Sequence, residues 1–328
     1  MATPALLPTE GRMPALDGAT GWLNTEPLTT EALRGRVVLV DFCTFTCINW
    51  LRTLPYVRAW ADRYRDDGLV VLGVHTPEFS FERDAGAVRR ALEALRVTHP
   101  VALDGGYAIW HAFANHYWPA LYFVDVTGRI RHHWFGEGDE TRSETVLQQL
   151  LAEAGADVLG RDPVTVVGEG VEAPADWAAL GSPEEYLGHG RSTAFASPQG
   201  TAPDRSHAYE VPARLRPGSW AAAGRWTVGA EAAVLDEPGG RLACRFRARD
   251  LHLVMGPVAP GVSVPFRVRL DGRPPGEAAG GDVDARGHGV ATGRRLHQLV
   301  RQPGPVDDRL FEIEFTAPGV AAYVLTFG

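Results

Sequence analysis

The pattern of apolar positions changes along the chain, from continuous apolar runs in the first half to strict alternation in the last third. Residues 37–42 (VVLVDF) and 69–74 (LVVLGV) are almost unbroken apolar runs, which is typical of parallel strands buried on both faces. Residues 51–65 and 84–95 repeat apolar side chains at helical spacing, and Asp84 is a suitable N-cap for the second helix. This part of the chain therefore predicts alternating strands and helices.

The same alternation of elements continues to residue 155. Residues 107–113 predict a short helix, 121–125 a strand, 130–134 the second strand of a hairpin, and 140–154 a last helix. Strands alternating with helices in this order are typical of an α/β sheet layered with helices. We therefore expect one α/β domain over residues 1–155.

The last part of the chain alternates apolar and polar residues with a period of two, as half-buried strands do. In residues 242–247, Leu242, Cys244 and Phe246 share one face. The same alternation of apolar residues recurs in residues 251–255, 266–270, 311–315 and 323–327. Short strands separated by Gly/Pro turns predict an all-β sandwich domain over residues 201–328.

Residues 156–200 differ from both parts in charge and in proline content. They contain two arginines against seven acidic residues, together with four prolines and few apolar runs. Such a composition is typical of a connector. The sequence thus predicts a first domain at 1–155, an acidic connector at 156–200 and a second domain at 201–328.

Composition excludes several classes of function. All 32 basic residues are arginine, so lysine Schiff-base chemistry and a P-loop lysine are excluded. The net charge of −8 indicates neither a basic surface for nucleic acid nor a basic patch for a membrane surface. Three cysteines in 328 residues do not make a disulfide scaffold, and neither a signal peptide nor a membrane span is evident. We therefore expect a cytoplasmic protein with reduced thiols.

One cysteine lies at a position typical of reactive thiols, between a strand and the start of a helix. Cys47 follows the strand at 37–42 and precedes the helix at 51–65. The amide N–H groups of a first helical turn lack intrahelical acceptors and stabilise a thiolate. Further along the chain, Trp118-Pro119 leads into the next strand, where a cis-proline would be useful. Cys47 is therefore the candidate nucleophile.

These motifs together resemble a known family. Residues 20–155 resemble the thioredoxin-like redoxins of the TlpA and AhpC/TSA type, in which a strand leads to a cysteine at a helix start and a cis-proline, here Pro119, lies against it. Cys47-Ile48-Asn49 and the following residues 51–55 resemble the soluble thioredoxin region of DipZ-type proteins. Residues 182–188, 281–284, 296–301 and 326–328 resemble the DipZ tail, a jelly-roll-like sandwich similar to carbohydrate-binding modules. The resemblance implies a thiol-dependent oxidoreductase whose substrate is a small thiol, a disulfide or a peroxide.

The chain departs from that family at two positions. The resolving cysteine of a Cys-x-x-Cys pair would stand at position 50, which is Trp50, whereas Cys43 stands where these proteins usually carry an aromatic residue. Oxidised Cys47 would then be a sulfenic acid or a mixed disulfide. It would be resolved either by Cys43 after a local shift or by an external low-molecular-weight thiol. Because Cys43 emerges from a buried strand, we expect its pKa to be raised and its reactivity to be low.

A peroxidase is one form of this chemistry. Thr44 precedes Cys47 by three residues, as a threonine does in peroxiredoxins, where its hydroxyl helps to hold the peroxide. The alternative is a threonine that only caps the turn. A peroxidase would also need a cation near the thiolate, and Arg52 and Arg131 are the candidates.

Two other functions remain open alongside the redox enzyme, which itself needs no cofactor. Cys43, Cys47, His75 and His116 could bind Cu(I), a soft ion that prefers thiolate and imidazole ligands. Alternatively, the chain could be a redox-inactive binding module whose sandwich captures a saccharide or a protein. The candidates for such a ligand face are Trp220, Trp226, His252 and Arg295.

Overall fold

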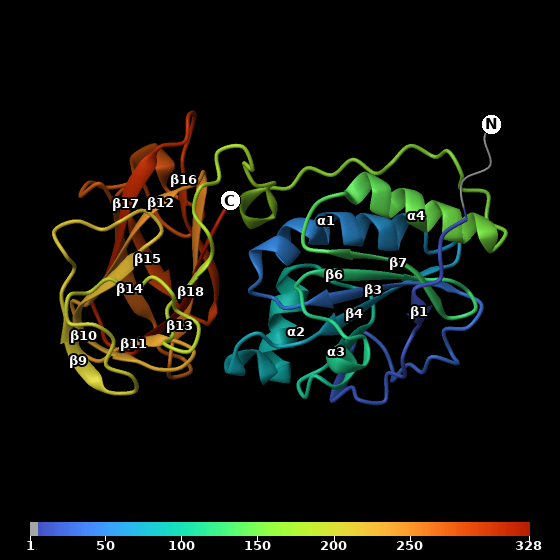
Figure 1. Cartoon of the computed structure of the whole chain (residues 1–328), viewed down its shortest axis with the longest axis horizontal. Coiled ribbons are helices and arrows are strands. Elements are labelled where there is room, and N and C mark those ends of the chain that lie inside the picture. The colour runs from blue at the N-terminus through green and yellow to red at the C-terminus, as the bar shows by residue number, and fades with distance from the viewer. Residues whose placement is uncertain (1–5) are drawn as a thin grey trace. The chain divides into compact units, whose positions relative to one another are not determined.

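The computed structural model describes residues 6–328, which form two compact units, one ending at Glu172 and the other running from Ala173 to Gly328 (Figure 1). The first is an α/β unit and the second is an all-β unit, as the sequence predicts. The observed boundary differs from the expected one. Residues 156–200 are divided between the units: buried Val158 packs in the first core and buried Leu187 in the second.

The first unit is built on one mixed sheet, whose order within the described chain is β1-β7-β6-β3-β4-β5-β2. Its strands are β1 (Gly11–Arg12), β2 (Gly21–Leu23), β3 (Val37–Cys43), β4 (Leu69–His75), β5 (Val101–Leu103), β6 (Ala120–Val124) and β7 (Arg129–Phe135). β3 pairs in parallel with β4 and antiparallel with β6, and β6 and β7 form the predicted hairpin. Every residue of β3 is buried, because helices cover both faces of the sheet.

The helices of this unit lie on the two faces of the sheet, as Figure 1 shows. They are α1 (Ile48–Arg63), α2 (Ala85–Ala94), α3 (Ala108–Ala112) and α4 (Glu140–Glu153), with the short 3₁₀ helices η1 (Ser80–Arg83) and η2 (Gly170–Glu172). Trp60 of α1 and Leu147 of α4 belong to one core cluster, whereas Ile109 of α3 belongs to the cluster on the opposite face. The predicted N-cap Asp84 accepts a hydrogen bond from the Ala87 amide at 2.9 Å.

The second unit is a curled antiparallel sheet with the order β15-β14-β17-β12-β10-β11-β18-β13-β16 in the part of the chain described, with β8 paired to β18 and β9 to β10. Its strands are β8 (Glu185–Tyr186), β9 (Ser206–Tyr209), β10 (Trp220–Val228), β11 (Ala233–Leu235), β12 (Arg241–Arg247), β13 (Asp250–Pro257), β14 (Val264–Leu270), β15 (His288–Ala291), β16 (Arg295–Arg301), β17 (Asp308–Phe315) and β18 (Val320–Phe327), with the 3₁₀ helix η3 (Gly276–Ala278). The curl makes two facing layers, consistent with the predicted sandwich.

The second core follows the alternation seen in the sequence. Leu242, Cys244 and Phe246 are buried in one cluster with side chains of the facing strands. β10 joins the two halves of the sheet, since its first residues pair with β12 and its last with β9 and β11. The change occurs at Gly224, whose φ of 89° places it in the left-handed region, where glycine carries no Cβ penalty.

Candidate active site

Cys47 occupies the position that the sequence predicts, at the N-cap of α1. Its backbone is extended (φ −75°, ψ 117°), its carbonyl accepts the first helical hydrogen bond from Leu51, and its side chain is half-buried. The first turn of α1 contains no acidic residue. The positive end of the helix therefore faces the thiol without a competing carboxylate from that turn.

The turn at Trp118-Pro119 lies against Cys47. The peptide bond is cis, as predicted, and the thiol Sγ lies 3.7 Å from the Trp118 carbonyl oxygen, to which it donates. Pro119 is buried immediately before β6, and the Trp118 indole donates to the Thr76 carbonyl at 3.1 Å. The turn is thus tied to the end of β4 beside the cysteine.

Trp50 fills the place of a second cysteine and covers a buried acid. Its side chain is 1% exposed, and its indole Nε1 donates to Asp41 Oδ2 at 3.0 Å. Asp41 lies in the centre of the sheet, and its other oxygen, Oδ1, is buried without a hydrogen-bond partner. Burial raises the pKa of Asp41 to about 7, which the Trp50 hydrogen bond opposes.

Cys43 is buried at the end of β3, and its carbonyl accepts a hydrogen bond from the Thr76 amide. Burial raises the pKa of the Cys43 thiol well above its ordinary value, and the carboxylates of Asp41 and Glu82 raise it further. The expectation of a thiol with a raised pKa is confirmed. Cys244 is likewise buried in the second core with a raised pKa.

Glu82 is a buried residue of this site that the sequence did not point to. Its Oε1 accepts from the Thr46 hydroxyl at 2.6 Å, and its Oε2 accepts from the amides of Glu78 and Phe79 at 2.6 and 2.9 Å. Burial raises its pKa to about 7, against these hydrogen bonds. The carboxyl group thus ties the loop before Cys47 to η1. No local pattern could have revealed it, because Thr46 and Glu82 are 36 residues apart.

Comparison with known proteins supports the resemblance over both units. Residues 182–328 match the family described as "Thioredoxin like C-terminal domain". The thiol-disulfide oxidoreductase YkuV of Bacillus subtilis is 31% identical over 141 residues, which is 95% of its length and 43% of this chain. The chain belongs to the thioredoxin-like redoxins. A solved thioredoxin-like protein in its oxidised form is 33% identical and covers 44% of this chain and 96% of its own, with a TM-score of 0.41.

This redoxin is also related to DipZ-type proteins. Protein DipZ of Mycobacterium bovis is 38% identical over 255 residues, or 77% of this chain. The chain spans about a third of the length of the DipZ proteins it matches, 36%. Within residues 6–328, the redoxin contains no helix that is long and apolar enough to cross a membrane.

The residues of the copper alternative are not assembled into a cluster. His75 is buried, stacks on Phe45 at a centroid distance of 5.7 Å, and has a pKa lowered to about 4 by burial. His116 is exposed. Among residues 6–328, no group of three or more His, Cys, Asp or Glu side chains is placed to hold a metal ion.

The residues considered for peroxide chemistry are placed differently from the expectation. Thr44 is fully buried, so its hydroxyl is not presented to solvent beside the thiol. Arg52 pairs with Glu137 at 3.2 Å, and Arg131 pairs with Asp125 and Glu153. Both cations are therefore engaged in structural ion pairs.

The aromatic candidates of the second unit are core residues. Trp220, Trp226 and His252 are at most 1% exposed, and Arg295 pairs with Asp282. Sugars stack on exposed aromatic faces, and these three rings offer none.

Proposed function

We propose that this redoxin is a thiol-dependent oxidoreductase that exchanges disulfides through a single nucleophile, Cys47. The observation that carries the proposal is the contrast among the three cysteines. Cys47 is half-buried at a helix N-cap beside the cis-Pro119 turn, whereas Cys43 and Cys244 are buried with raised pKa values. The relationship to thiol-disulfide oxidoreductases supports a disulfide as the substrate.

The proposed reaction uses one protein thiol and one external thiol. The Cys47 thiolate attacks one sulfur of a substrate disulfide, forming a mixed disulfide and releasing the other substrate sulfur as a thiolate. A low-molecular-weight thiol then attacks the mixed disulfide, freeing Cys47 and leaving as a disulfide with the first substrate sulfur. The net reaction replaces one sulfur of the substrate disulfide by the small thiol, so one disulfide is consumed and one is formed. The substrate thiolate released in the first step takes up the proton that the small thiol loses in the second.

An external thiol is favoured over Cys43 as the resolving group for a physical reason. A thiol attacks as its thiolate, and Cys43 is 2% exposed with a pKa raised by burial and by nearby carboxylates. Position 50 cannot act either, because Trp50 packs there against Asp41. Small thiols can reach the half-buried Cys47 directly.

Three matched variants test this mechanism: Cys47→Ser, Cys43→Ser and Cys244→Ser. Each folded protein is incubated with bis(2-hydroxyethyl) disulfide, and the adduct is located by peptide mass mapping. The wild type, Cys43→Ser and Cys244→Ser are expected to carry one adduct on residue 47 and to lose it when 2-mercaptoethanol is added. Cys47→Ser is expected to form no adduct under the same conditions.

An adduct that forms equally fast in Cys47→Ser would contradict the proposal. A wild type that forms an internal Cys43–Cys47 disulfide instead of the adduct would restore Cys43 as the resolving thiol. Protection of both thiols until a Cu(I) chelator is added would favour the copper-binding alternative.

A further inference from the structure

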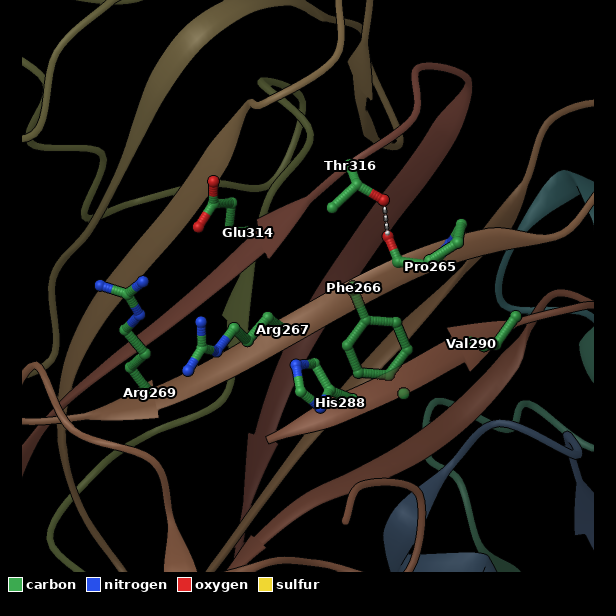
Figure 2. Close-up of a pocket in the computed structure, with 9 residues that line it drawn as sticks. Pro265, Phe266, Arg267, Arg269, His288, Val290, Glu314 and Thr316 are labelled. Carbon is green, nitrogen blue, oxygen red and sulfur yellow. Dashed lines mark hydrogen bonds between the residues drawn. The ribbon is translucent and has the colours of Figure 1, made fainter. Parts of the chain in front are cut away.

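The outer face of the second unit carries a pocket of about 560 Å³ that none of the chemistry above uses. A volume of this size is typical of sites for small molecules. Figure 2 shows its lining side chains, which come from the edge strand β15 and from β14 and β17: Pro265, Phe266, Arg267, Arg269, His288, Val290, Glu314 and Thr316. The pocket combines half-buried arginine side chains with apolar walls.

Arg267 and Arg269 alternate with buried Phe266 and Val268 along β14, so their side chains lie on the same outer face. Both are half-buried. Within residues 6–328 neither guanidinium forms an ion pair, whereas the neighbouring Arg241 pairs with Glu312 at 3.0 Å. The Nε of Arg267 is moreover buried without a hydrogen-bond partner. A buried donor in this state is stabilised when an acceptor reaches it.

The acidic groups around the pocket do not neutralise this pair. Glu312 stands opposite Arg269 in the sheet register but is engaged by Arg241. Glu314 stands opposite Arg267 and forms no ion pair within the described chain. At the edge, His288 lies 3.5 Å from Asp284. Among the side chains that line the pocket, two arginines stand against one carboxylate, Glu314, so the lining carries a net positive charge.

We propose that this pocket binds a small organic anion, whose carboxylate or phosphate group accepts hydrogen bonds from Arg267 and Arg269. Planar guanidinium groups match the paired oxygens of both anions. Val290, 50% exposed, and Pro265 offer an apolar wall for a short carbon chain, and the Glu314 carboxylate can accept from a hydroxyl group of the ligand. Phe266 is 2% exposed, so the pocket has no open aromatic face for stacking a neutral sugar.

Titration of the full chain with succinate, followed by ligand-observed NMR, tests the proposal. Succinamide, which has the same length and no charge, is the matched ligand control, and glycerol 3-phosphate distinguishes a phosphate from a carboxylate. Either anion is expected to bind at least tenfold more tightly than succinamide. The variant Arg267→Gln is expected to weaken that binding at least tenfold.

Arg245→Gln is the matched protein control, since it removes the same charge from β12 and does not line the pocket. It is expected to bind like the wild type. Arg269→Gln provides a second variant if Arg267→Gln fails to fold, which thermal unfolding reports. Binding of neither anion above the level of succinamide, or equal binding by the wild type and both pocket variants, would overturn the proposal. Because Cys47 takes no part, the result is independent of the redox proposal.

Discussion

At the scale of single residues, the most consequential pair is Trp50 and Asp41. A carboxyl group in the centre of the sheet has one hydrogen bond, from the Trp50 indole, and its second oxygen is unpaired. Ionising such a group inside the fold is unfavourable, which is why burial raises the pKa of Asp41 to about 7. Trp50 therefore does more than occupy the position of a cysteine, because its indole donates a hydrogen bond to the buried Asp41 carboxyl group.

We predict that Asp41→Asn gains stability relative to the wild type as the pH rises. In the wild type the unfolded chain releases the Asp41 proton near its ordinary pKa of about 3.9, whereas the folded chain holds it to about 7. Between these values the folded state binds more protons, so the free energy of unfolding falls by up to about 1.4 kcal/mol per pH unit. Asparagine cannot ionise, so the variant lacks this loss.

Urea unfolding of both proteins at about pH 5, 6, 7 and 8 measures the difference. The comparison is needed because buried histidines act in the opposite direction: burial lowers the pKa of His75 and His99 to about 4, so their contribution rises with pH. These histidines are common to both proteins and cancel. A difference that stays constant from about pH 5 to 8 would contradict a raised pKa of Asp41.

At the scale of elements, the loop between β3 and α1 is held by the 3₁₀ helix η1. Glu82 accepts three hydrogen bonds, from the Thr46 hydroxyl and from two amides. We predict that Glu82→Leu lowers the free energy of unfolding by about 2–4 kcal/mol, because it leaves three buried donors without an acceptor. Glu82→Gln is expected to stay within about 1 kcal/mol of the wild type, since its amide oxygen can accept from both backbone amides.

Urea unfolding at about pH 8, where a carboxyl group with a pKa of about 7 is mostly ionised, measures both effects. Glu93→Leu on the exposed face of α2 is the control for adding an apolar side chain. Its expected effect is below about 0.5 kcal/mol. A Glu82→Leu variant as stable as Glu93→Leu would show that Glu82 does not hold the loop.

The sequence predicted the elements that depend on their own pattern. β3 and β4 appear as apolar runs because both faces are buried, and β12 alternates because one face is. β5 was missed, since three residues are too short to show a period, and β10 was missed because it changes its partners at Gly224. Both strands are specified by their neighbours.

The residues of the candidate site likewise divide into those that the sequence predicted and those that it did not. The placement of Cys47 and the cis bond at Pro119 followed from local sequence and resemblance. Glu82 could not be found, because its partners are distant in the chain. Arg52 and Arg131 were plausible cations by type alone, and only the structure reveals the carboxylates that engage them. The type of a residue indicates which reactions its side chain could support. Whether the side chain is free to do so depends on the groups that it contacts in the fold.

At the scale of the whole molecule, the two units have separate cores. The boundary at Glu172 and Ala173 lies inside the segment expected to be a connector, and the chain on each side of it packs into its own unit. Arg161 pairs with Asp67 in the first unit. In the second unit, Glu185 accepts hydrogen bonds from Ser192 and from the Trp220 indole. Residues near both ends of the expected connector are therefore held in one unit or the other.

Trp177 is an exposed aromatic residue of this segment, and we predict that chymotrypsin cuts first after it. Its side chain is 60% exposed, and it lies in a turn just after the unit boundary; exposed turns are the preferred sites of proteolytic cleavage. Tyr117 and Phe135 are also exposed, but Phe135 belongs to β7, and Tyr117 donates its amide to Asn115 and lies two residues before buried Pro119.

Limited digestion of the full chain, followed by mass spectrometry, identifies the first cut. Two fragments are expected, and each should keep its secondary structure by circular dichroism, because each unit has a core of its own. Trp177→Ala is the matched control and should slow the first cut several-fold without changing thermal stability, since the side chain is mostly exposed. An initial cut within residues 44–172, or an unchanged rate in Trp177→Ala, would place the weakest backbone inside a unit, and the division into two independently stable parts would then be wrong.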